Sequence, residues 1–241
     1  MKVSLLIPVY NAQSLIGKNI RKSYEALLSL NDDFEIIIVD DNSNDKSYRF
    51  KRLIDRARVV TGKDVKYLSY TKGPSRRENL GQAFFSVKHE IAGFIDADFS
   101  CDVGYLIEAV NILNKESADI VIGSRYIKGA ETRREIGRRI ISFLYNSTIR
   151  ILFGSSVKDH QCGLKVFRMS SVKQILTDMG YDAKFIRGWF WDAELLIRAQ
   201  RKRLKIIEFP VKWRCADSST FSLKRELKSL IAIFGFWKTN H

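Results

Sequence analysis

Two aspartates one residue apart, Asp96 and Asp98, follow an apolar run that begins at residue 91. Side chains at positions i and i+2 of a strand or turn point the same way, so these carboxylates repel each other unless a cation or a proton lies between them. Oxygen ligands suit Mg2+ or Mn2+, and Mg2+ is usually held by one or two carboxylates together with substrate phosphates. The pair therefore predicts a divalent metal site that also binds a diphosphate. The alternative is a solvated acidic loop.

A second acidic pair, Asp40 and Asp41, ends a continuous β-branched run that begins at Phe34. A carboxylate here can accept hydrogen bonds from a base N–H or a sugar hydroxyl. The alternative is that Asp41 or Asn42 caps the following helix. We expect Asp40 to face the ligand.

Arginines stand at other strand ends. Arg76 and Arg77 follow a predicted strand, and Arg125 comes directly after the run at residues 120–124. The guanidinium group suits bidentate contact with phosphate, so these residues are candidate phosphate ligands. Solvated surface arginines are the alternative.

Three further acids, Asp159, Asp192 and Glu194, are candidates for proton transfer or sugar binding. The last two lie beside an aromatic cluster, where partial desolvation raises a carboxyl pKa. A helix N-terminal position is the alternative for Asp192. His160 has no second His or Cys at metal-ligand spacing, so we treat it as a loop residue.

Alternating strand and helix patterns must position these residues. We expect an α/β fold with a mostly parallel, doubly wound sheet that has helices on both faces and binds its ligand beyond the carboxyl ends of the strands. The predicted strands are 2–10, 34–41, 65–70, 91–96, 118–125 and 204–214, with a loop and a short strand over 157–168. The predicted helices are 14–30, 42–57, 75–89, 103–115, 133–154, 188–203 and 221–238.

The net charge of +14 is one-sided. Residues 1–120 hold 17 basic and 17 acidic side chains, whereas residues 121–241 hold 24 and 10. A basic half indicates an anionic partner such as phosphates or lipid headgroups, and two basic amphipathic helices, 133–154 and 221–238, suit an anionic membrane surface. No nucleic-acid-binding motif appears, so no nucleic-acid partner is expected. Three widely spaced cysteines favour a reducing cytoplasm.

Five motifs in order, "IPVYN", "IIIVDDNS", "FIDADFS", "IGSRY" and "VKDHQCGLKVFR", resemble family 2 glycosyltransferases with the GT-A fold. The branch is similar to dolichyl- or polyprenyl-phosphate mannosyl- and glucosyltransferases, and the resemblance covers about residues 1–215. It implies inverting transfer of a hexose from a nucleotide-sugar, UDP-glucose or GDP-mannose, to a polyprenyl phosphate. The enzyme would be peripheral on the cytoplasmic membrane face, with room for a separate membrane-anchoring partner.

The resemblance also implies roles for individual residues. The nucleotide-sugar would be bordered by Pro8, Tyr10, Asn11, Asp40, Asp41, Arg76, Asp96 and Arg214. Asp96 and Asp98 would hold the metal, with Ser100 where relatives sometimes place a metal-contacting Gln. The acceptor phosphate would meet Arg125, Ser142 and one of Arg138 or Arg139. The catalytic candidates are Asp96, Asp98, Arg125, Asp159, Asp192 and Glu194.

We expect one catalytic domain over residues 1–241, in which residues 1–125 bind the nucleotide-sugar and residues 126–241 face the acceptor and the membrane. Three alternatives remain open. One is a transferase that acts on a soluble or other glycan acceptor. A second is a sugar nucleotidyltransferase, although "PVYNAQSL" lacks the Gly- and Arg-rich loop of that class. A third is a non-catalytic basic module that binds membrane or nucleic acid.

Overall fold

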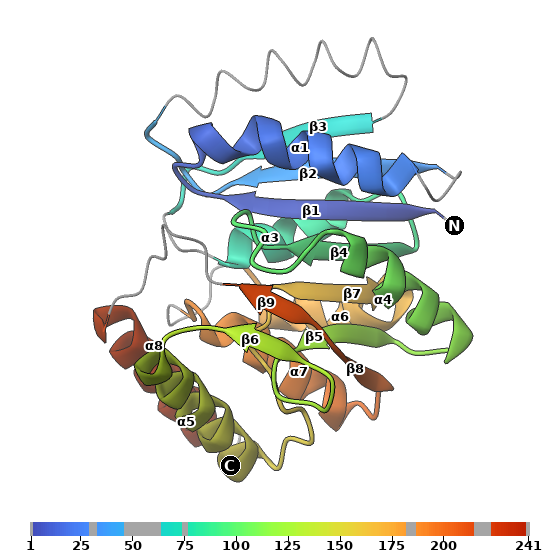
Figure 1. Cartoon of the computed structure of the whole chain (residues 1–241). Helices are drawn as coiled ribbons and strands as arrows, with labels where there is room; N and C mark the ends of the chain where they lie inside the picture. Colours follow the sequence, from blue (N-terminus) through green and yellow to red (C-terminus); the bar gives the residue numbers. More distant parts are fainter. Residues whose placement is uncertain are drawn as a thin grey trace.

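The computed structural model describes residues 2–28, 33–45, 64–73, 77–181, 187–214 and 223–239. Within these residues, seven strands form the central sheet in the order β3-β2-β1-β4-β7-β5-β8 (Figure 1). All neighbouring strands are parallel except β7, which is antiparallel to both of its neighbours. The strands are β1 (Val3–Val9), β2 (Phe34–Asp40), β3 (Asp64–Ser69), β4 (Ile91–Ile95), β5 (Ile120–Ser124), β7 (Leu164–Arg168) and β8 (Ile206–Pro210).

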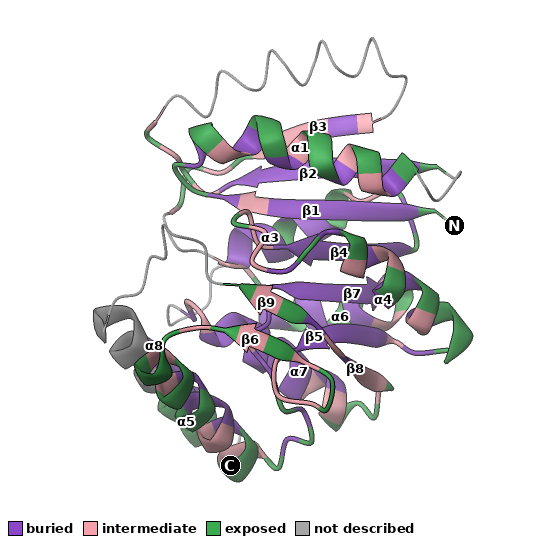
Figure 2. Ribbon diagram, viewed as in Figure 1, coloured by how far each residue is buried: buried purple, intermediate pink, exposed green. Residues whose placement is uncertain are grey.

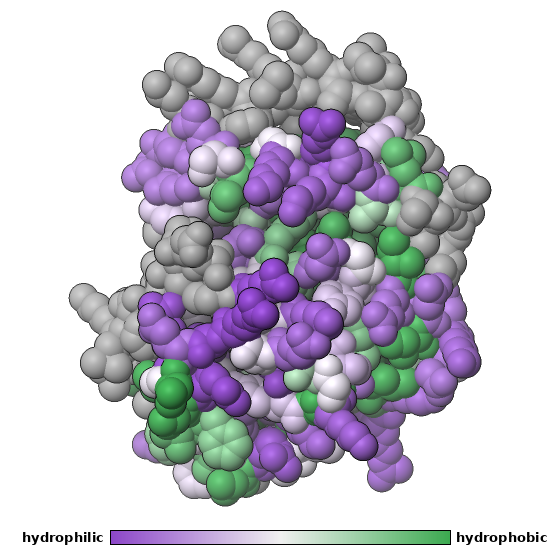
Figure 3. Space-filling model, viewed as in Figure 1, coloured by the Kyte–Doolittle hydropathy of each residue, from purple (hydrophilic) through white to green (hydrophobic). Residues whose placement is uncertain are grey.

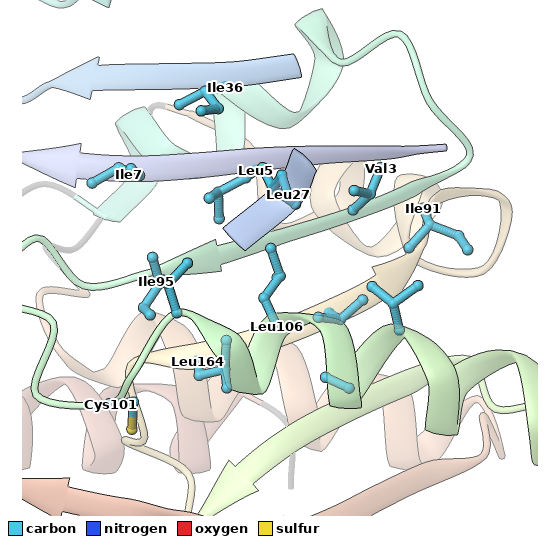
Figure 4. Close-up of a cluster of buried hydrophobic side chains, with 14 of the residues drawn as sticks. Val3, Leu5, Ile7, Leu27, Ile36, Ile91, Ile95, Cys101, Leu106 and Leu164 are labelled. Atoms are coloured by element: carbon cyan, nitrogen blue, oxygen red, sulfur yellow. The ribbon is translucent and has the colours of Figure 1, made fainter. Parts of the chain in front are cut away.

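Helices cover both faces of this sheet, which confirms the predicted α/β class. One face carries α1 (Gln13–Leu28) and α4 (Gly104–Lys115), and Figure 4 shows Leu27 of α1 beside Leu5 of β1 and Leu106 of α4 near Ile95 of β4. The other face carries α3 (Arg77–Ala83), the 3-10 turn η2 (Phe84–Ser86), α6 (Met169–Met179) and α7 (Phe190–Arg201). The strands between the helical layers are buried, and exposed residues lie on the outer sides of the helices (Figure 2).

The position of β7 shapes the edge that matters for binding. The parallel strands β1, β2, β4 and β5 all end at one edge, whereas β7 starts there because it runs the other way. The loop that precedes β7 therefore meets the ends of β4 and β5. A parallel pattern alone does not predict this antiparallel insertion.

A second, smaller unit joins the sheet. Strands β6 (Glu131–Arg133) and β9 (Lys212–Arg214) form a two-stranded parallel sheet. Helices α5 (Ile136–Phe153) and α8 (Leu223–Thr239) pack together through a cluster that also includes Phe190 of α7 (Figure 1). Among the described residues, no helix is both long and apolar enough to cross a membrane.

Several predicted boundaries change. The helix expected over 75–89 is shorter, because α3 ends at Ala83 and continues only as a 3-10 turn to Ser86. The strand expected over 204–214 is divided between two sheets, since Pro210 ends β8 and β9 pairs with β6. The helix expected over 42–57 falls mostly outside the described residues. Helix α6 and strand β6 were not predicted.

Candidate active site

The ends of β1 and β2 meet through hydrogen bonds between the segments that follow them. Asn11, at a positive φ of 48°, accepts hydrogen bonds from the backbone N–H groups of Asn44 and Asp45 and donates its own backbone N–H to Ser43 Oγ. A left-handed conformation is tolerated better by Asn than by most residues. Tyr10, just before it, is exposed.

The two acids at the end of β2 take different positions. Asp40 is buried, and its carboxylate accepts hydrogen bonds from Ser43 and Ser69. Asp41 is half-buried and accepts a hydrogen bond from Asn79 of α3. Asp40 therefore stabilises the turn after β2, and Asp41 is the more accessible of the two at this edge.

Contacts with Gly163 and Arg77 hold Asp96 in place on two sides. Its backbone N–H donates to Gly163 O at 2.9 Å, and its carboxylate packs so closely on Gly163 that a Cβ there would lie 2.1 Å from Oδ2. Arg77 Nη2 lies 2.6 Å from Asp96 Oδ1. The first aspartate of the pair is thus fixed and neutralised by protein groups.

Asp98 is exposed, and no side chain in the described part of the chain forms an ion pair with it. Its Oδ1 accepts the backbone N–H of Ser100 at 3.0 Å, in a turn that places Phe99 at a φ of 47°. Desolvation by the surrounding protein, and then the charge of Asp96, raise the pKa of the Asp98 carboxyl. A divalent cation beside Asp98 would relieve both effects.

The donor set fits Mg2+ or Mn2+ because it contains only oxygen ligands. Within the described part of the chain, no group of three or more His, Cys, Asp or Glu side chains is arranged to hold a metal ion. Two carboxylates would therefore have to share the ion with ligands from elsewhere, as the predicted diphosphate would provide.

A row of alternating charges runs inward from Asp96. Arg77 contacts Asp192 of α7 at 3.5 Å, and Lys165 of β7 contacts the other oxygen of Asp192 at 3.0 Å. Lys165 also donates to Cys162 O at 2.6 Å. Reasoning from the sequence missed Lys165 entirely, although a lysine inside the apolar run "LKVFR" is a signal that it needs a buried partner.

Arg125 and Asp159 form a buried pair. Arg125 donates from Nε at 2.7 Å, from Nη2 at 2.8 Å and from its backbone N at 2.9 Å to the two carboxylate oxygens. Although burial opposes ionisation, the Arg125 guanidinium holds the pKa of Asp159 below its usual value. Arg125 also lies over the rings of Tyr126 and Trp213, at 5.6 and 5.5 Å. The Arg125 guanidinium already binds Asp159. A role at the acceptor phosphate would therefore require that Arg125 and Asp159 separate, or that they contact the phosphate together.

The remaining acidic candidates and His160 lie inside the protein. Glu194 is fully buried and bridges Arg187 at 2.6 Å and Arg198 at 2.8 Å. His160 is in a loop, as expected, but it is buried between Ser155 and Asn146, and burial lowers its pKa to about 3. It stays neutral at physiological pH.

The basic half meets the acidic pair through β9. Arg214 is exposed and donates its backbone N–H to Ser100 O at 2.9 Å, and Cys101 pairs with Trp213 in an isolated bridge. Arg214 is therefore brought close to the Asp96–Asp98 loop. Arg76 lies outside the described residues.

Helix α5 carries the other predicted acceptor ligands. Ser142 is buried and donates to Gln161 Oε1 at 3.5 Å, in the loop that leads to β7. Arg139 is exposed, and Arg138 is half-buried and lies 3.2 Å from Glu135. Ser142 thus lies beside the site loop, whereas the two arginines lie near the start of the helix.

A mostly parallel sheet with an inserted antiparallel strand and an acidic pair at its carboxyl edge defines a glycosyltransferase of the GT-A class. Two solved structures similar to this chain share this fold. Glucosyl-3-phosphoglycerate synthase from Mycobacterium tuberculosis, in complex with Mn2+, UDP and glucosyl-3-phosphoglycerate, has a TM-score of 0.64 at 18% identity and covers 97% of this chain and 79% of its own. Mannosyltransferase PcManGT from Pyrobaculum calidifontis, with GDP-mannose and Mn2+, has a TM-score of 0.63 at 16% identity over 97% of this chain and 63% of its own.

The chain belongs to glycosyl transferase family 2, whose model matches residues 4–176. Its relatives are dolichyl-phosphate glucosyltransferases and polyprenyl-phosphate sugar transferases. Glycosyltransferase AglD of Haloferax volcanii is 29% identical over 229 residues, which are 94% of this chain and 35% of AglD. Dolichyl-phosphate beta-glucosyltransferase of Saccharomyces cerevisiae is 28% identical over 240 residues, which are 92% of this chain and 69% of the yeast protein. The chain thus spans about a third of the archaeal relative.

Proposed function

We propose that this chain transfers a hexose from UDP-glucose or GDP-mannose to a polyprenyl phosphate, with inversion and with a divalent metal. The observation that carries the proposal is the place of the Asp96–Asp98 loop. One of its acids, Asp98, forms no ion pair with any residue that the structure describes, and the loop is tied by Ser100 to Arg214 of the basic half. The relatives that act on dodecaprenyl and dolichyl phosphates support a lipid-phosphate acceptor.

The donor lies at the carboxyl edge of the sheet in this proposal. Tyr10, Asn11 and Asp41 border the nucleotide, and Asp98 and Asp96 hold the metal with the diphosphate. The metal would supply charge stabilisation for the leaving diphosphate. Arg214 is exposed beside the same loop and adds a cation for the diphosphate.

The acceptor brings its own nucleophile. A lipid phosphate is an anion at neutral pH, so its oxygen attacks C1 of the hexose without a strong base. The bond from C1 to the diphosphate breaks, and the products are the polyprenyl-phosphate hexose with inverted C1 and the nucleoside diphosphate. The scheme requires no proton transfer by Asp159. The Asp159 carboxylate is instead paired with Arg125, which keeps it ionised. The protein then acts mainly by positioning the two reactants.

The exposed face of α5 and α8 supports an acceptor at an anionic membrane surface. Hydrophobic side chains gather there in the lower left of the space-filling view (Figure 3). The large exposed ones are Ile136, Ile140, Phe143, Leu144, Ile151, Ile231, Phe234 and Trp237. Arg139 and Arg150 are exposed on the same helix as the first five. A patch of this kind with nearby cations suits a peripheral site on the cytoplasmic membrane face, with or without a separate anchoring partner. A soluble glycan acceptor would leave this patch without a role.

A donor and acceptor screen tests the proposal. Purified protein with Mn2+ or Mg2+ is incubated with a short polyprenyl phosphate and either UDP-glucose or GDP-mannose, and the lipid product is separated from the sugar nucleotide. We expect transfer with one donor, inverted stereochemistry and loss of transfer with EDTA. Transfer to a soluble glycan, and none to polyprenyl phosphate, would favour the alternative acceptor.

A further inference from the structure

Lys165 is a fully buried lysine in the middle of the central sheet. It lies opposite Phe94 of β4 and Ile122 of β5, and its side chain is 1% exposed. Its neighbours along β7, Leu164 and Val166, face the α1 and α4 side, so Lys165 points to the α3 and α7 side. A buried ammonium group is unfavourable unless it is paired.

The partners of Lys165 account for its burial. Nζ lies 3.0 Å from Asp192 Oδ1 and 2.6 Å from Cys162 O, and 5.2 Å from the centroid of the Phe94 ring. It therefore holds one acid of α7 and the carbonyl of the loop that precedes β7.

Both contacts lead to Asp96. Asp192 uses its second oxygen for Arg77, and Arg77 lies 2.6 Å from Asp96. Cys162 directly precedes Gly163, the residue against which the Asp96 carboxylate packs. Lys165 thus supports Asp96 from two sides, through the row Asp192–Arg77 and through the loop at Gly163.

The arrangement of this row of charges explains why Lys165 is needed. Arg77 and Lys165 both lie over the Phe94 ring, at 5.3 and 5.2 Å, and the four charges alternate in sign. Without Lys165, Asp192 and Asp96 would compete for the single guanidinium of Arg77. If Arg77 bound Asp96 less firmly, the Asp96 carboxylate would be free to change its distance to Asp98.

We propose that Lys165 is a positioning residue for the donor site, which fixes the Asp96 carboxylate through Asp192 and Arg77. This inference rests on the proposed function only in that Asp96 and Asp98 hold the metal. Lys165 itself touches neither substrate nor metal in this scheme.

The test compares Lys165→Met, Asp192→Asn and the double variant with the wild type. Methionine keeps the apolar stem and removes the charge. We expect Lys165→Met to weaken Mn2+ binding about fivefold or more, measured by electron paramagnetic resonance titration without sugar nucleotide, and to lower kcat about 10- to 100-fold with an unchanged acceptor KM. The melting temperature of each variant reports its folding.

The double variant separates positioning from simple support of the fold. If Lys165 acts through Asp192, removing both charges harms Mn2+ binding no more than removing Lys165 alone. Lys202→Met, on the exposed end of α7, is the matched control and should leave both readouts unchanged.

Three results would overturn the inference. One is a lowered melting temperature with wild-type Mn2+ affinity and kcat, which would make Lys165 a structural residue only. A second is that the losses of Mn2+ affinity caused by Lys165→Met and Asp192→Asn multiply in the double variant. Absence of Mn2+ binding by the wild type would also overturn it. Intact Mn2+ binding without hexose transfer would instead contradict the proposed donor or acceptor.

Discussion

At the scale of residues, neighbouring acids in the sequence have different surroundings. Asp96 is neutralised by Arg77, whereas Asp98 next to it is exposed and carries a raised pKa. Asp159 is buried and carries a lowered pKa because Arg125 binds it in a bidentate arrangement. The pKa values of Asp98 and Asp159 therefore shift in opposite directions, because Asp98 is desolvated beside a like charge and Asp159 is paired with a cation.

Asp98→Asn should abolish most of the hexose transfer, by about 10²- to 10³-fold in kcat, as expected when a group that stabilises developing charge is removed. The melting temperature should not fall. Because the folded state raises the pKa of Asp98, its ionised form opposes folding, and this penalty is present above the raised pKa and absent below about pH 4. The variant should thus melt at the same or a slightly higher temperature than the wild type at pH 7, and the difference should vanish at pH 3. A large loss of thermal stability at pH 7 would show that the pair is structural.

Arg125→Ala should destabilise the protein by about 3–5 kcal/mol, because it leaves the Asp159 carboxylate buried and unpaired. In the wild type the lowered pKa of Asp159 contributes stability above about pH 4, which is lost as the pH falls through the lowered value. The variant should show the opposite slope, since protonation then removes an unpaired charge. Thermal melts of both proteins between pH 7 and pH 3 measure the two slopes.

A second variant separates stability from acceptor binding. Arg125→Lys keeps a cation beside Asp159 but loses the bidentate contact. If the pair serves the acceptor phosphate, this variant should raise the acceptor KM more than the donor KM. Equal changes in both KM values would contradict a role at the acceptor.

At the scale of elements, α5 has two different faces. Its buried residues Tyr145 and Ile149 pack with Phe190 and α8, and its exposed face carries Phe143 and Leu144. A helix with a buried stripe normally exposes polar residues on the other side. The second apolar face is the one that we propose to contact the membrane surface.

Phe143→Ser combined with Leu144→Ser should reduce binding to anionic liposomes by at least about tenfold, since each side chain would lose part of the roughly 1.5–3 kcal/mol that its full burial provides. The melting temperature should be nearly unchanged because both side chains are exposed. Cosedimentation measures the binding. Leu28→Ser, an exposed leucine at the end of α1, is the matched control. Equal binding of the double variant and the control would exclude α5 from the membrane contact.

At the scale of the whole molecule, a neutral first half and a basic second half share one sheet. Strand β7, from the second half, is inserted between β4 and β5, and β8 extends the sheet beyond β5. The whole net charge of +14 lies after residue 120, on the half that we propose to face the acceptor. In the proposed function, the neutral half would bind the donor and the basic half would face the acceptor.

Binding of the whole protein to anionic liposomes should weaken strongly between about 0.1 and 1 M NaCl, because the Debye length falls from about 10 to about 3 Å. Binding to zwitterionic liposomes should be weaker at low salt and should change little. The same cosedimentation assay measures both. Anionic liposome binding that does not respond to salt would contradict the role of the basic half.

The amino-acid sequence by itself determined the alternation of strands and helices, the acidic pairs at strand ends and the family resemblance. These features are local, because strand periodicity and the residue that follows a strand are both encoded within a few positions. The mostly parallel sheet and the glycosyltransferase class could therefore be predicted, and the comparisons confirm them.

Only the tertiary structure decided which charges meet. Arg125 and Asp159 are 34 positions apart, and Arg77, Asp96, Lys165 and Asp192 come from four separate segments. Their contacts depend on the antiparallel insertion of β7 between β4 and β5, and strand order is not encoded in the period of any single segment. The sequence thus placed acids and arginines at one edge of the sheet, and the fold decided which of them form pairs.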